Sequence, residues 1–129
     1  MQSFEVRGGK KLFGEITPQG AKNEALQIIS AVLLTAEKVT IKNIPDIIDV
    51  NLLIDLLGEM NVKTERISRD TCIFQAENVN VEYLHSEAYH KKSGKLRGSV
   101  MLAGPMLARF KKAYKIGRAS CRERVYSSV

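Results

Sequence analysis

The sequence has few of the residues from which metal sites and disulfide frameworks are built. Only two cysteines, Cys72 and Cys121, occur among the 129 residues, and their separation does not fit a pair of metal ligands. His85 and His90 lie five residues apart with no cysteine or carboxylate pattern around them, so we expect no metal site. Cys72 falls within an expected strand (71–75), which predicts that its side chain acts as a small buried hydrophobe.

Long apolar runs are also missing. None approaches the length needed to cross a bilayer, and the N-terminus lacks the apolar centre of a signal peptide. We therefore expect a cytoplasmic protein that does not bind membranes. The hydrophobic content of 44% and charged content of 26% are typical of a soluble globular chain, and the length suffices for one modest core.

The net charge of +6 and the pI near 9.4 would suit a protein that binds nucleic acid. Half of that charge, however, lies in residues 115–129. The remaining chain has no basic run longer than pairs such as Lys10–Lys11, and its aromatic residues are not interleaved with basic ones as in single-strand binders. We therefore expect no nucleic acid partner, and a basic α/β binding module remains only as the non-enzymatic alternative.

Two cations stand where apolar helices are expected to begin. Lys22 lies in the first turn of a helix expected from about Ala21 to Thr35, and Arg97 occupies the same place in a later helix. A helix N-terminus carries partial positive charge and normally favours Asp or Glu, so each cation is either solvated or part of an anion site. Two such helices together would suit a doubly anionic small molecule.

Three segments then carry a specific resemblance: GAKNEAL (20–26), NIPDIIDV (43–50) and LRGSVMLAGPMLARF (96–110). In this order they resemble the N-terminal part of the UDP-N-acetylglucosamine 1-carboxyvinyltransferases, a branch of the enolpyruvyl transferase family, over about residues 4–113. The resemblance implies an inside-out α/β domain built from strand-helix-strand-helix-strand-strand units, with helices inside and sheets outside. It also implies a two-domain protein several times longer, of which this chain is an N-terminal piece.

The resemblance implies transfer of the enolpyruvyl group from phosphoenolpyruvate to the 3-hydroxyl of UDP-N-acetylglucosamine, with release of phosphate, at the start of peptidoglycan synthesis. Carried over by motif, Lys22 would hold the phosphoenolpyruvate anion, Asn23 would hydrogen-bond the sugar substrate, and Arg97 would complete the anionic pocket. These two small molecules would be the partners, without a metal or organic cofactor. The alternative enzyme is the sister 3-phosphoshikimate 1-carboxyvinyltransferase, which usually has Ser where Asn23 stands.

The remaining pattern predicts one α/β unit. We expect a strand, a helix and a hairpin at residues 38–44, 49–59 and 62–75. Asp46 and Asp49 could be paired carboxylates for acid–base chemistry, but their position at a helix start makes Asp49 a better N-cap.

The segment that follows is expected to be less regular. Residues 82–95 are charged and show no clear core stripe, so we interpret them as a connection with both histidines on its surface. Gly104–Pro105 should interrupt the helix that starts near Arg97.

The expected domain organisation has three parts. Residues 1–20 would contain two short strands, 3–6 and 12–17, which the resemblance assigns to the other domain, so that here they lack their normal partners. Residues 21–114 would form a partial catalytic α/β domain.

Residues 115–129 depart from the family, which continues with a glycine-rich loop carrying the general acid, a Cys or an Asp. Residues 116–125 would be translated from ATC GGA AGA GCG TCG TGT AGG GAA AGA GTG, a frame through a common sequencing adapter. We therefore expect a non-native, disordered tail rather than a genuine basic arm. Cys121 is not assigned the general-acid role, no catalytic residue is assigned, and the chain by itself is expected to be inactive.

Overall fold

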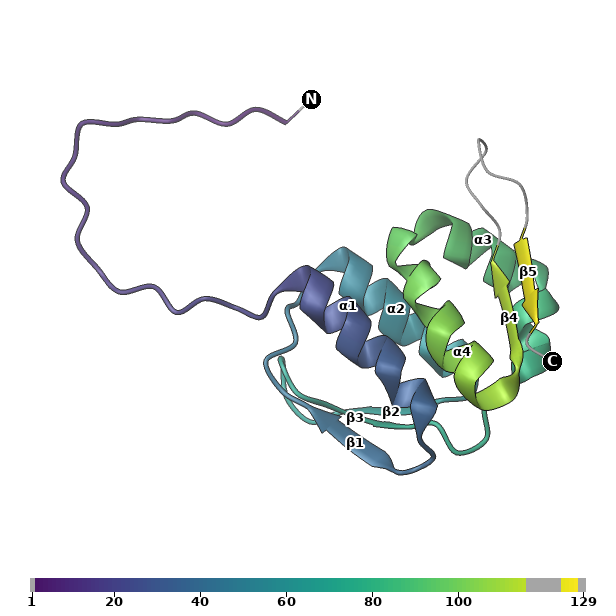
Figure 1. Cartoon of the computed structure of the whole chain (residues 1–129). Coiled ribbons are helices and arrows are strands. Elements are labelled where there is room, and N and C mark those ends of the chain that lie inside the picture. The colour runs from purple at the N-terminus through teal and green to yellow at the C-terminus, as the bar shows by residue number, and fades with distance from the viewer. Residues whose placement is uncertain (1, 116–123, 128–129) are drawn as a thin grey trace.

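Helices α1 and α2 lie side by side over one face of a three-stranded antiparallel sheet (Figure 1). The computed structural model describes residues 2–115 and 124–127. The elements of this first layer are α1 (Lys22–Ala31), the short 3-10 helix η1 (Val32–Leu34), β1 (Lys38–Ile41), α2 (Ile48–Glu59), β2 (Lys63–Arg66) and β3 (Cys72–Gln75). Strand β3 lies between β1 and β2, and its Phe74 faces Val39 on one side and Thr64 on the other.

The core lies between the sheet and the helices. Cys72 and Phe74 are buried while Ile73 between them is only half-buried, which is the two-residue period of a strand with one covered face. From the helices, Ile29, Leu33, Leu53, Leu56 and Leu57 are fully buried. Cys72 is 2% exposed, which confirms the prediction of a buried side chain, and burial raises the pKa of its thiol.

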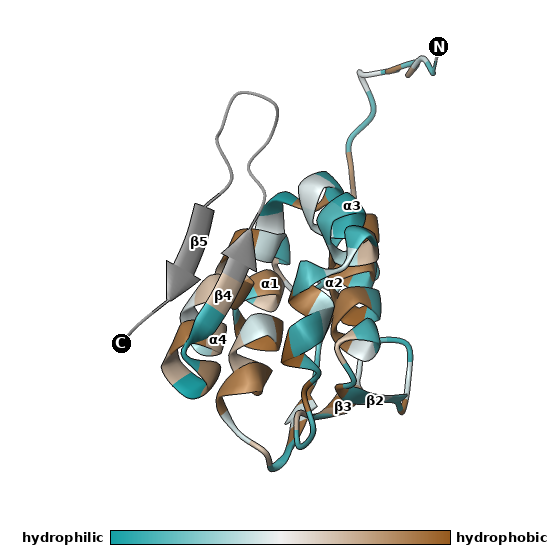
Figure 2. Cartoon of the chain, turned by 90° about the vertical axis from the view of Figure 1, so that its right-hand side faces the viewer, coloured by the Kyte–Doolittle hydropathy of each residue, from teal (hydrophilic) through white to brown (hydrophobic). Residues whose placement is uncertain are grey.

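The second half of the chain adds a helical layer beside α1. It consists of η2 (Val81–His85), α3 (Glu87–Lys95), the 3-10 helix η3 (Arg97–Leu102), α4 (Ala103–Phe110) and the strand pair β4 (Lys112–Lys115) and β5 (Arg124–Ser127). Helix η3 packs against α1, and α4 packs against η1. Figure 2 shows apolar residues along α1 and α4, whereas α3 is largely hydrophilic.

One arginine joins the two layers. Nη1 of Arg109, in α4, donates to the carbonyl oxygens of Leu33 at 3.0 Å, Thr35 at 3.0 Å and Ala76 at 2.7 Å. Its guanidinium carbon also lies 4.8 Å from the ring centre of Phe110. These carbonyls lie at the ends of η1 and β3, so Arg109 satisfies backbone acceptors of the first layer and fixes α4 to it.

The sequence-based boundaries of α1, β1, α2 and the β2–β3 hairpin agree with the structure within a few residues. The N-cap prediction for Asp49 was wrong, because α2 begins at Ile48 after an uncapped Ile47. Asp49 therefore lies inside the first turn of α2, where its carboxylate is free to face a neighbouring helix.

Residues 82–95 were also predicted incorrectly as a mere connection. They form the end of η2 and all of α3, and they bury Leu84, Tyr89 and Ser93. Ser86 caps α3 by accepting a hydrogen bond from the backbone N–H of Tyr89. One buried side chain per helical turn is too few to produce an apolar stripe that can be recognised in the sequence.

The two histidines of this segment differ. His85, at the end of η2, is exposed as expected, whereas His90 is half-buried in α3. The prediction that both histidines lie on the surface was therefore correct for His85 and wrong for His90.

Pro105 does not interrupt α4. The chain changes from 3-10 to α geometry at Leu102–Ala103, so Pro105 falls in the first turn of α4. Backbone N–H groups in that turn have no intrahelical acceptor, and a proline is tolerated there.

The two strands expected at 3–6 and 12–17 are not formed. Residues 2–19 run as an extended segment away from the body (Figure 1), and the side chains of Phe4 and Phe13 are 93% and 105% exposed. A strand pair without a third partner or an apolar surface to cover is marginal in water. The assignment of this segment to another domain stays a prediction.

The tail also differs from expectation in part. Residues 124–127 form β5, which pairs antiparallel with β4 so that Lys112 faces Ser127. Residues 116–123 and 128–129, Cys121 among them, lie outside the described residues. An open strand edge such as that of β4 accepts any extended backbone, whatever its origin.

We expect substitution of Gly20 and Gly58 by alanine to change stability in opposite directions. A Cβ at Gly20 would lie 2.0 Å from the carbonyl oxygen of Asn43, whereas nothing lies within 4 Å of a Cβ at Gly58 in α2. Gly20→Ala should therefore lower the free energy of unfolding by about 1–3 kcal/mol. Gly58→Ala should raise it by about 0.5–1 kcal/mol, because alanine favours a helix interior. Urea unfolding monitored by circular dichroism checks both, and equal effects would contradict the close approach at Gly20.

Candidate functional site

Lys22 is the first residue of α1 and forms an ion pair with α2. Its Nζ lies 2.6 Å from Oδ2 of Asp49, and the two side chains are 50% and 41% exposed. Neither helix has a side-chain N-cap, so the carboxylate supplies the negative charge that the two adjoining helix starts favour. A half-exposed pair of this kind contributes only about 0–1 kcal/mol, so it orients the ammonium group more than it stabilises the fold.

A glycine brings these two helix starts together. The backbone of Gly20 passes so close to the Asn43 carbonyl that a Cβ would lie at 2.0 Å from the oxygen. Asn43 itself has a φ of 59°, in the left-handed region that asparagine tolerates better than most residues. The turn at Asn43 therefore lies directly against the entrance of α1, and the loop after it leads into the turn that carries Asp49.

A second glycine places Arg97. Arg97 opens η3 and is exposed, and the next residue, Gly98, packs on Leu26 of α1. A Cβ at Gly98 would lie 2.9 Å from Cδ1 of Leu26, so the missing side chain allows η3 to approach α1 closely.

The structure brings the three predicted binding residues to one cavity. An open cavity of about 510 Å³ is lined by Lys22, Asn23, Leu26, Gln27, Asp49, Arg97, Gly98, Val100 and Met101. The two cations come from different elements, α1 and η3, as the pattern of cations at two helix starts had indicated.

The lining combines charge, hydrogen-bond donors and an apolar wall. Within the described part of the chain, no intramolecular side-chain hydrogen bond is made by Asn23, Gln27 or Arg97, and all three line the cavity. Leu26, Val100 and Met101 contribute apolar surface beside them. Two cations with amides suit a small molecule that carries anionic groups and hydroxyls.

Sequence reasoning missed two polar residues of this cavity. Gln27 follows Asn23 by four residues and therefore lies on the same face of α1, a spacing that could have identified it. Asp49 gave no such signal, because its pairing with Lys22 depends on how α2 packs against α1.

Other kinds of site find no support in the described ranges, 2–115 and 124–127. No group of three or more His, Cys, Asp or Glu side chains there could hold a metal ion. No helix within the same ranges is long and apolar enough to cross a membrane.

Comparisons with known proteins identify the family of the chain. A family model described as EPSP synthase (3-phosphoshikimate 1-carboxyvinyltransferase) matches residues 6–124. That match extends into residues 115–129, so the foreign origin of this segment stays a prediction.

Two relatives with more than half of their aligned residues identical to this chain are named UDP-N-acetylglucosamine 1-carboxyvinyltransferase. The chain is 61% identical over 110 residues to a UDP-N-acetylglucosamine 1-carboxyvinyltransferase of Porphyromonas gingivalis, covering 85% of this chain and 25% of the relative. It is 58% identical over 125 residues to the protein of the same name from Bacteroides thetaiotaomicron, covering 92% and 29%. The chain thus spans about a quarter of the length of the curated relatives it matches.

The fold has a counterpart among solved structures. The crystal structure of the enolpyruvyl transferase NikO from Streptomyces tendae superposes with a TM-score of 0.68 at 21% identity, covering 83% of this chain and 24% of NikO. At that identity the likeness concerns the fold alone, and it confirms the predicted enolpyruvyl transferase architecture. Since the family model covers most of the residues, the chain belongs to the EPSP synthase family of carboxyvinyl (enolpyruvyl) transferases.

Proposed function

We propose that the full-length protein beginning with this sequence transfers the enolpyruvyl group of phosphoenolpyruvate to the 3-hydroxyl of UDP-N-acetylglucosamine and releases phosphate. The observation that carries the proposal is the cavity shared by Lys22, Asn23 and Arg97. The names of relatives at 58–61% identity favour this substrate pair. The reaction would be the first committed step of peptidoglycan synthesis in the cytoplasm, with small molecules as the only partners.

The side chains of the cavity would have different roles in the reaction. A base takes the proton of the sugar hydroxyl, whose oxygen adds to C2 of phosphoenolpyruvate while an acid gives a proton to C3, and a tetrahedral intermediate forms. Loss of a proton from C3 and departure of phosphate from C2 then restore the double bond. Lys22 and Arg97 would hold the phosphate and carboxylate groups, and the Asn23 amide would hydrogen-bond the sugar.

Asp49 gives Lys22 a partner within the chain. Its carboxylate holds the ammonium group at the edge of the cavity, where an arriving dianion can share it. Protonation of C3 needs a general acid as well, and none is assigned among the described residues. The family resemblance places that acid in the glycine-rich loop beyond Tyr114.

The description of the family model supports one alternative, transfer to shikimate 3-phosphate. The two activities share phosphoenolpyruvate and differ in the acceptor. Calorimetry with the full-length protein separates them, because saturable binding of shikimate 3-phosphate without binding of UDP-N-acetylglucosamine would reverse the assignment.

Lys22 provides the direct test of the site. In the full-length protein, Lys22→Ala should reduce turnover by at least about 100-fold, because a cation that meets the developing charge is lost. Lys22→Arg should recover little, because a planar guanidinium replaces a compact ammonium in a shaped pocket. Phosphate release from phosphoenolpyruvate in the presence of UDP-N-acetylglucosamine is the measurement.

The thermal stability of the Lys22→Ala protein serves as the control for its loss of turnover. The lysine is half exposed at a helix start, so the melting temperature should change little. Near-normal turnover of a folded Lys22→Ala protein would show that the lysine is merely solvated and would remove the site assignment.

The 129-residue chain by itself should catalyse nothing. It spans about a quarter of its relatives, so most groups that would surround the reacting atoms are missing. Preorganised donors act together, and part of a pocket loses far more than its share of the effect. Phosphoenolpyruvate should bind only in the millimolar range, about −4 kcal/mol. Phosphate release that requires both UDP-N-acetylglucosamine and the purified chain would contradict this expectation.

A further inference from the structure

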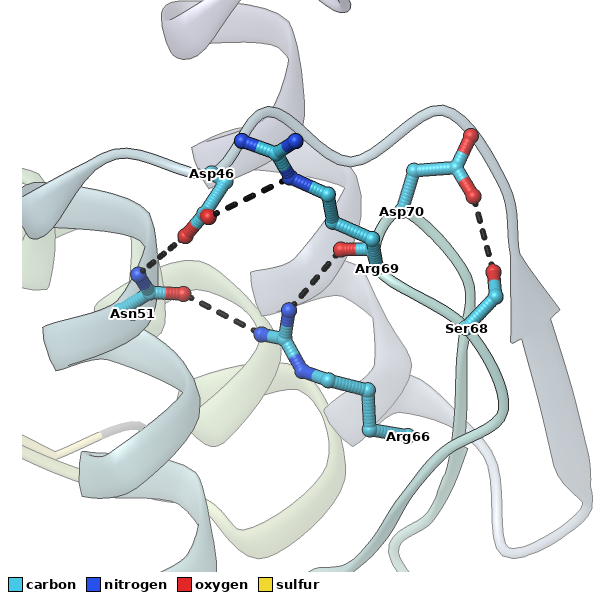
Figure 3. Close-up of polar contacts among 6 residues, drawn as sticks. All are labelled: Asp46, Asn51, Arg66, Ser68, Arg69 and Asp70. Atoms are coloured by element: carbon cyan, nitrogen blue, oxygen red, sulfur yellow. Dashed lines mark hydrogen bonds and ion pairs between the residues drawn. The ribbon is translucent and has the colours of Figure 1, made fainter.

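The start of α2 is held by a polar cluster next to the Lys22 site. Four side chains, those of Asp46, Asn51, Arg66 and Arg69, connect the loop before α2 with the β2–β3 hairpin, and we call them the Asn51 clamp (Figure 3). Helix α2 has no side-chain N-cap, so these contacts fix its first turn in place of a cap.

Asn51 is the centre of the clamp because its amide is used at both ends. Its Nδ2 donates to Oδ1 of Asp46 at 3.0 Å, and its Oδ1 accepts from Nη2 of Arg66 at 3.2 Å. The other guanidinium nitrogen of Arg66 donates to the carbonyl oxygen of Arg69 at 2.9 Å, and Nε of Arg69 lies 3.7 Å from Oδ2 of Asp46. Removal of Asn51 therefore removes the only side-chain link within this cluster that starts from α2 itself, and leaves the loop before α2 joined to the hairpin by the Asp46–Arg69 pair.

The hairpin is also joined to the loop through the backbone. The N–H of Ile44 donates to the carbonyl oxygen of Asp70 at 2.8 Å, so the hairpin turn is anchored independently of Asn51. This fixed turn gives the clamp a rigid partner. The pKa of Asp46 is lowered, first by the hydrogen bond from Asn51, which indicates that the carboxylate is the favoured form.

The clamp and the Lys22–Asp49 pair belong to the same stretch of surface. Lys22, Asp46, Ile47, Ile48, Asp49 and Asn51 line one open cavity. Lys22 and Asp49 also line the substrate cavity described above. Asp49 lies between Asp46 and Asn51 in the sequence, so any shift of this first turn changes the position of the Asp49 carboxylate.

We propose that Asn51 is a positioning residue that acts on Lys22 through Asp49. By fixing the first turn of α2 to the hairpin, it sets the carboxylate that holds the Lys22 ammonium group at the cavity. The inference rests on the proposed function and extends it to a residue that touches no substrate.

A double-mutant cycle in the full-length protein tests the path of this effect. Asn51→Ala should raise the KM for phosphoenolpyruvate by about 3- to 10-fold, because a small displacement near a bound anion weakens its contacts. The KM for UDP-N-acetylglucosamine should stay within about twofold. In an Asp49→Ala background, Asn51→Ala should have no further effect, because the carboxylate through which it acts is gone.

The chain offers a matched control on the same hairpin. Ser68 donates to Oδ1 of Asp70 at 2.9 Å and makes no contact with α2 in Figure 3. Ser68→Ala removes one polar side chain of the hairpin but leaves the clamp intact, so both KM values should be unchanged.

A measurement on the 129-residue chain shows whether the clamp was broken without unfolding. NMR titration should find the pKa of Asp46 below its ordinary 3.8 in the unchanged chain and closer to that value in Asn51→Ala.

Asn51→Asp, made in the full-length protein, keeps the acceptor for Arg66 and loses the donor to Asp46. It should therefore also raise the KM for phosphoenolpyruvate selectively.

Each contrary outcome has its own meaning. Additive effects of Asn51→Ala and Asp49→Ala, or equal changes in both KM values, would show a merely structural role and overturn the proposal. Unchanged kinetics in folded Asn51→Ala would do the same. Failure of the unchanged full-length protein to release phosphate from phosphoenolpyruvate and UDP-N-acetylglucosamine would instead remove the proposed function, so the two failures are distinguishable.

Discussion

The close packing of α1 between α2 and η3 is the constraint on which the candidate site depends. Two glycines permit it, Gly20 against the Asn43 carbonyl and Gly98 against Leu26. Buried residues of α1 such as Leu26 and Ile29 supply the apolar area that holds the helices together. The polar residues of the site are thereby placed by packing, and they contribute little to stability themselves.

Electrostatics explains why two cations can stand at helix starts. Lys22 and Arg97 oppose the positive end of the helix dipole, which would favour their displacement. Asp49 offsets part of that cost for Lys22, and exposure to water screens the charge of Arg97. The remaining field is positive and directed at an open cavity, a condition suited to an anionic ligand.

Local patterns predicted much of the first layer. The apolar period of α1 and α2, the alternation in β1 and the turn of the β2–β3 hairpin are all short-range signals, and each element formed close to its expected place. Prediction was poorer for α3, whose buried residues Leu84, Tyr89 and Ser93 are widely spaced. It was wrong for the opening strands, because a strand depends on a partner that periodicity does not reveal.

By itself the sequence determined the family, the α/β class and the identity of Lys22, Asn23 and Arg97 as candidates, because short motifs and helix starts are local properties of the chain. Only the tertiary structure decided that these residues share one cavity, that Asp49 pairs with Lys22 instead of capping α2, and that Asn51 links α2 to the hairpin. The contacts between Lys22 and Asp49 and between Asn51 and Arg66 join segments separated by 15 or more residues. Their geometry follows from how the helices and the sheet pack, which no local pattern specifies.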